Sequence, residues 1–95
     1  LRRIRTTLAF VGINVWEAER GVTTSSSEKM HRKIQLMESA DKSILLVDSS
    51  KYAKFSPWRV AGVDDFYRII TDCGLSAGAR QQLEAAGASL LYADS

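Results

Sequence analysis

The chain is short of the residues that build disulfide frameworks, metal centres and membrane spans. Its 95 residues include one cysteine, Cys73, and one histidine, His31. A lone cysteine excludes an internal disulfide framework and is typical of a reducing cytoplasm, where we expect the protein to be found. One cysteine and one histidine do not make a metal site, and no cofactor is predicted. No apolar run approaches the ~20 residues needed to span a bilayer, so no membrane partner is expected.

An excess of charge of one sign is also lacking. Thirteen basic and 11 acidic side chains leave a net charge of +2, which does not by itself indicate binding to nucleic acid or to an anionic membrane. The arginines at positions 2, 3 and 5 are interpreted as a flank and not as a DNA contact. Hydrophobic residues make up 45% of the chain, as in an ordinary globular protein, and this length provides one domain with a modest core.

Apolar runs that stop at polar residues predict the strands. The clearest runs from Ser43 to Asp48 and is typical of a strand buried on both faces of a parallel sheet. Further strands are expected at 7–12, 58–61, 66–71 and 88–92, and residues 13–24 are expected to form a loop.

Two helices are expected between these strands. Ser25 with Glu28 three residues later predicts a capping box at the start of the first. That helix carries apolar residues spaced along one face, namely Met30, Ile34 and Met37. Ser76 and Gly87 predict the two ends of the second helix. The alternation of strands and helices indicates an α/β fold with a mainly parallel sheet and flanking helices.

Polar residues follow three of the predicted strands. They are Gly12 and Asn14 after the first, Asp48 and Lys51 after the second, and Asp72 after the third. Because open α/β sheets bind ligands at the carboxyl ends of their strands, we expect these residues to share a site. One cation, one carboxylate and several hydroxyls suit a small phosphorylated polyol. Lys51 would meet the phosphate as a point charge, and Asp48 would accept bonds from hydroxyls.

Each candidate also has a purely structural interpretation. Lys51 could pair with Asp48 on the surface, which contributes little to stability. Asp48 could instead cap loop amides in an Asx-turn, and Ser50 could be an ordinary loop serine rather than a phosphate ligand. Both interpretations remain open from the residues alone.

Thr23 and Thr24 are further candidates because they precede the first helix, whose positive end favours anions. The alternative is that they only cap that helix. Gly12 would allow a tight turn or a close approach of the backbone to a ligand, and Asn14 would bond a substrate hydroxyl. The loop aromatics Trp16, Trp58 and Tyr52 are expected to pack against the sheet edge or a partner subunit, the alternative being stacking on a sugar.

Five segments in this order resemble the carboxyl-terminal effector domain of DeoR-type transcriptional repressors. They are Phe10–Gly12, Gly21–Thr24, Leu46–Tyr52, Ile69–Asp72 and Leu83–Ala88. The resemblance implies a ribose-5-phosphate isomerase-like fold that senses a phosphorylated sugar or related metabolite. Residues 1–95 would be the carboxyl-terminal part of that sensor. DNA would be bound only by an amino-terminal helix-turn-helix outside this chain, and a homo-oligomer is expected because repressors read paired half-sites.

An isomerase-like enzyme is the alternative that this resemblance raises. Glu28-Lys29 and the spacing from Asp48 to Lys51 are similar to the isomerases, but Ile13-Asn14 stands where their acid pair follows the glycine. Their glycine-rich loop with a catalytic lysine has no counterpart, so no catalytic residue is predicted. The DeoR pattern itself has a second glycine where this chain has Val15. A domain that only oligomerises, without a ligand, is the third possibility.

Overall fold

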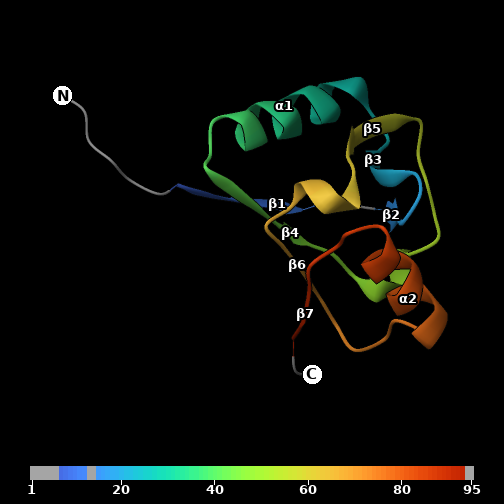
Figure 1. The fold of residues 1–95 in the computed structure, drawn as a ribbon. Helices are drawn as coiled ribbons and strands as arrows, with labels where there is room; N and C mark the ends of the chain where they lie inside the picture. The colour runs from blue at the N-terminus through green and yellow to red at the C-terminus, as the bar shows by residue number, and fades with distance from the viewer. Residues whose placement is uncertain (1–6, 13–14, 94–95) are drawn as a thin grey trace.

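The structure, a computed structural model, describes residues 7–12 and 15–93 and contains two sheets and two helices (Figure 1). The larger sheet has four strands that pair in parallel in the order β1-β4-β6-β7. These strands are β1 (Leu8–Gly12), β4 (Lys42–Leu46), β6 (Arg68–Thr71) and β7 (Leu90–Tyr92). Two α-helices, α1 (Ser27–Glu38) and α2 (Ala77–Ala85), complete the alternation of strands and helices. The predicted α/β class with a mainly parallel sheet is confirmed.

The predicted loop over residues 13–24 is wrong for its described part, which supplies two of the three strands of a second sheet. This antiparallel sheet has the order β2-β3-β5, with β2 (Val15–Glu17), β3 (Gly21–Thr24) and β5 (Trp58–Ala61). Gly21 allows the turn into β3 because its φ is +80° and a Cβ there would overlap the carbonyl of Ala61. All four residues of β3 are buried, so this strand lacks the alternation by which half-buried strands are recognised.

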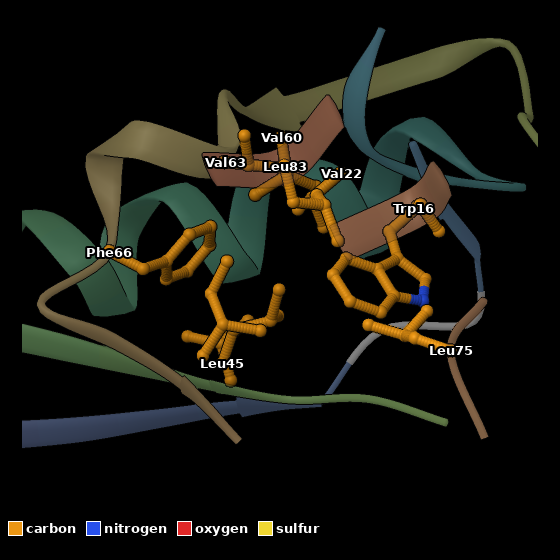
Figure 2. Close-up of a cluster of buried hydrophobic side chains, with 11 residues drawn as sticks. Trp16, Val22, Leu45, Val60, Val63, Phe66, Leu75 and Leu83 are labelled. Atoms are coloured by element: carbon orange, nitrogen blue, oxygen red, sulfur yellow. The ribbon is translucent and has the colours of Figure 1, made fainter. Parts of the chain in front are cut away.

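The hydrophobic core lies between the two sheets and the helices. Figure 2 shows Trp16 and Val22 of the second sheet in one cluster with Leu45 of β4 and Leu83 of α2. The predicted stripe of α1 packs against this cluster through Met30, Ile34 and Met37. The two sheets therefore share one core.

The ends of the helices follow the predicted chemistry closely. The cap of α1 is Ser26 and not Ser25, since the Ser26 hydroxyl accepts a bond from the amide of Lys29 at 3.1 Å. Ser76 caps α2 by accepting from the amide of Ala79, also at 3.1 Å. Gly87, with a φ of +91°, follows the end of that helix as expected.

Within the described residues, one face of the parallel sheet carries exposed apolar side chains. Residues of β1 alternate between exposed and buried, and the buried ones face the core. Large apolar side chains lie on the other face: Leu8, Phe10, Leu46 and Leu91 are between 43% and 55% exposed. The prediction that the Ser43–Asp48 strand is buried on both faces holds for Ser43, Ile44 and Leu45 but not for Leu46. Neither described helix has the length and apolar character of a membrane-crossing segment.

Additional short turns connect these elements. The turn η1 (Ser49–Lys51) follows β4, and η2 (Val63–Asp65) follows β5. The first of these places the polar residues that the sequence singled out after the Ser43–Asp48 strand.

Candidate functional site

The carboxyl ends of the parallel strands meet at one rim, and a hollow of about 590 Å³ lies there. We call it the strand-end hollow. Gly12, Asp48, Lys51 and Asp72 all line it, with Thr71 and apolar side chains of β4 and β6. The expectation that three strand ends share one edge is therefore confirmed.

The turn that carries Asp48 and Lys51 is tied to the second sheet. The backbone carbonyl of Asp48 accepts a bond from the Lys51 amide at 3.1 Å and another from the indole N–H of Trp16 at 3.0 Å. The Asp48 side chain makes no capping bond to the turn, so the Asx-turn alternative is not what the structure shows. Within residues 7–12 and 15–93, no carboxylate pairs with the Lys51 ammonium. Both side chains are exposed at the rim.

Asp72 is held by a network that the sequence did not specify. One carboxylate oxygen accepts from the Gly74 amide at 2.8 Å, and the other accepts from the Ser49 amide at 3.3 Å. A bond from the Ser49 side chain, with these amides and a smaller contribution from Asp48, lowers the pKa of Asp72 to about 2. Asp72 is therefore ionised near neutral pH. The strand-end hollow thus offers carboxylate acceptors and one ammonium.

The two serines of this turn have different surroundings. Ser49, not Ser50, contacts Asp72, while Ser50 is exposed and does not line the hollow. The consecutive serines gave no signal to distinguish them, because the turn geometry decides which one faces β6.

The two threonines lie away from Lys51. Thr23 and Thr24 belong to β3 and are 4% and 1% exposed, and neither lines the strand-end hollow. The Thr23 hydroxyl accepts from the Ser56 amide at 2.8 Å, which is a structural bond between β3 and the segment before β5. The structure does not bring either threonine to the hollow that Lys51 lines, because both belong to β3.

Gly12 lines the hollow, and the packing around it does not require a glycine at this position. A Cβ added there would meet no atom within 4 Å, and its carbonyl accepts from the Lys33 ammonium at 2.6 Å. The other predicted residue of this strand end, Asn14, lies outside the described residues.

Trp16, Tyr52 and Trp58 do not line the strand-end hollow, and Trp16 and Tyr52 pack against each other. Trp16 is 0% exposed and lies 5.1 Å from the Tyr52 ring in an edge-to-face contact. The Tyr52 hydroxyl donates to Gln82 of α2 at 3.0 Å and accepts from the Ala18 amide at 3.2 Å. Burial raises the pKa of Tyr52. Trp58 is 42% exposed.

The side chains of metal-binding type do not cluster in the described part of the chain. Its His, Cys, Asp and Glu side chains do not gather in groups of three or more that could hold a metal ion. Cys73 is exposed and lies 3.6 Å from the carbonyl of Ala93.

Comparison with known proteins gives a consistent set of similarities. Residues 1–73 match the family described as the DeoR C terminal sensor domain. The chain is 31% identical over 91 residues to the HTH-type transcriptional regulator GlpR of Haloferax volcanii, covering 96% of this chain and 36% of that protein.

Two further relatives come from Escherichia coli. The uncharacterized HTH-type transcriptional regulator YgbI of strain K12 is 30% identical over 93 residues, with 98% of this chain and 36% of that protein covered. A putative aga operon transcriptional repressor of O157:H7 is 27% identical over 84 residues, covering 88% of this chain and 31% of that protein. The chain thus spans about a third of the length of these relatives.

Proposed function

The chain belongs to the DeoR C-terminal sensor domain family, and from this we propose that its strand-end hollow binds a phosphorylated sugar that controls a repressor. The family is one of sensor domains within transcriptional regulators, so the domain is regulatory and not an enzyme. The identity of the effector as a sugar phosphate goes further than the family assignment and rests on the chemistry of the hollow.

The observation that carries the proposal is the set of charged groups at one rim. Lys51 has no carboxylate partner among the described residues, so its ammonium is available to a phosphate as a compact point charge. Asp48 and the ionised Asp72 are acceptors only, which suits the hydroxyl donors of a sugar. Because carboxylates would repel a phosphate, the ligand would place its phosphate toward Lys51 and its hydroxyls toward the two acids.

Control of DNA binding would follow from a difference in affinity between two arrangements of the full-length protein. A ligand shifts such an equilibrium only by binding one arrangement more tightly than the other. We propose that the DNA contact is made by another domain of the cytoplasmic repressor, and that the protein is a homo-oligomer because paired half-sites require paired readers.

Calorimetric titration of the full-length protein with a panel of sugar phosphates and the matching unphosphorylated sugars tests this proposal. We expect a phosphorylated sugar to bind, and its sugar alone to bind far more weakly. Replacing Lys51 by Ala should weaken binding about tenfold or more, since a charge-assisted contact to phosphate is lost. Lys54→Ala is the matched control, because Lys54 is exposed and outside the lining of the hollow.

Two results would contradict the proposal. If no phosphorylated sugar binds, or if Lys51→Ala and Lys54→Ala bind with equal affinity, Lys51 is not a phosphate ligand. A DNA-binding assay on the same proteins adds a functional readout, since the effector should change DNA affinity in the wild type and not in Lys51→Ala.

A further inference from the structure

A second hollow, of about 300 Å³, lies between the end of β3 and one side of α1. It shares no lining residue with the strand-end hollow. Three cations line it, namely Lys29, Arg32 and Lys33, at positions i, i+3 and i+4 of the helix. Residues at this spacing are neighbours on a helix surface, so like charges there repel one another.

The three cations are not neutralised by ion pairs in the described part of the chain. Within residues 7–12 and 15–93, no carboxylate lies at ion-pair distance from any of the three cations. Partial burial lowers the pKa of Lys33, and the charges of Lys29 and Arg32 lower it further. The helix therefore concentrates positive charge beside a cavity.

The last residue of β3 adds a hydroxyl to the residues that line the hollow. Thr24 also lines the hollow, is 1% exposed, and its hydroxyl has no hydrogen-bond partner in the described part of the chain. A buried hydroxyl without a partner is costly, and most buried side-chain hydroxyls in proteins are bonded. A ligand oxygen in the hollow would complete it.

We propose that this second hollow is an oxyanion site that binds a phosphate group. The Arg32 guanidinium can contact two phosphate oxygens at once, while Lys29 acts as a point charge. Lys33 donates one bond to the Gly12 carbonyl at 2.6 Å, which leaves two of its three donors for the anion. The Thr24 hydroxyl donates to a further oxygen. The proposal is independent of any ligand at Lys51.

The test is an NMR titration of the protein with inorganic phosphate at constant ionic strength, followed in amide spectra. We expect saturable shifts at residues 24, 29, 32 and 33. Arg32→Ala should weaken the affinity about tenfold or more, whereas Arg80→Ala, an exposed arginine on α2, should leave it unchanged. A phosphomonoester such as phenyl phosphate forms a second arm and distinguishes a site for free phosphate from one for a phosphorylated metabolite.

Substitutions of Thr24 separate recognition from folding. Thr24→Ser keeps the hydroxyl and should retain phosphate binding, while Thr24→Val keeps the shape and should weaken binding severalfold. Lys51→Ala should leave these shifts intact, which distinguishes this site from the strand-end hollow. Shifts that saturate only around residues 48–51, or equal phosphate affinity in Arg32→Ala and Arg80→Ala, would overturn the proposal.

Discussion

Replacing Trp16 by Phe is expected to destabilise the protein and to loosen the turn that carries Lys51. Trp16 lies in β2, yet its indole N–H donates to the carbonyl of Asp48 at 3.0 Å. The indole is 0% exposed and contacts the Tyr52 ring. Phe cannot donate this bond and fills less of the space, so the second sheet would lose its side-chain bond to the Asp48 carbonyl and keep only the backbone bond from Ala53 to Trp16.

The magnitude follows from two losses. The Asp48 carbonyl would keep its bond from the Lys51 amide but lose the one from the indole, which costs about 1 kcal/mol. The smaller ring leaves unfilled core volume, which costs about 1–2 kcal/mol. The free energy of unfolding should therefore fall by about 2–3 kcal/mol, and the unfolding temperature of a domain of this size by roughly 10–20 °C.

Urea unfolding followed by far-ultraviolet circular dichroism measures this loss of stability. The slope of the free energy of unfolding against urea concentration should stay the same, because the fold is retained. Trp58→Phe is the matched control: Trp58 is 42% exposed, and its replacement should alter stability by less than about 0.5 kcal/mol. If the two variants are equally stable, the indole bond to Asp48 does not hold the turn and the reasoning fails.

Three further predictions address the rim, the core and the second sheet. Hydrogen bonds lower the pKa of Asp72 from 3.8 to about 2. The stability that these bonds contribute is therefore present above pH 4 and is lost as the pH falls toward 2. Asp72→Asn should remove this acid-dependent loss of stability, which urea midpoints measured between pH 5 and pH 2 would show. Leu83→Ala, at a residue 0% exposed, should cost about 2–5 kcal/mol in urea unfolding, whereas Leu91→Ala, at a residue 50% exposed, should cost well under half as much. Gly21→Ala should lower the unfolding temperature because the φ of Gly21 is +80° and a Cβ there would overlap the backbone. The control Gly78→Ala in α2 has room for a Cβ and should raise the free energy of unfolding by about 0.5–1 kcal/mol. A Gly21→Ala variant as stable as the wild type would contradict the assigned turn.

Much of the rim could be predicted because its signals are local. The apolar run that ends at Asp48 marks a buried strand and the polar turn after it, within one stretch of about ten residues. Ser76 and Gly87 likewise mark the two ends of α2 by their own backbone and side-chain chemistry. Because parallel strands place their carboxyl ends on one side, the meeting of Gly12, Asp48 and Asp72 follows from the strand assignments.

The second sheet could not be predicted because its strands are defined by partners far along the chain. The strands β2 and β3 have three and four residues, too few to show a period, and β3 pairs with β5, where Thr23 lies opposite Arg59. This pairing makes Thr23 and Thr24 buried strand residues and not members of a loop before the helix. It also buries Trp16 against Tyr52, a residue that lies after β4.

The amino-acid sequence by itself determined the α/β class, both ends of α2 and the shared edge of the parallel strands, because the signals for the strands and for the α2 ends lie within a few neighbouring residues. Only the tertiary structure decided that Ser49 and not Ser50 holds Asp72, and that Thr24 joins the cations of α1. Those contacts depend on how elements pack in three dimensions, and side chains distant in sequence meet only after the strands have paired.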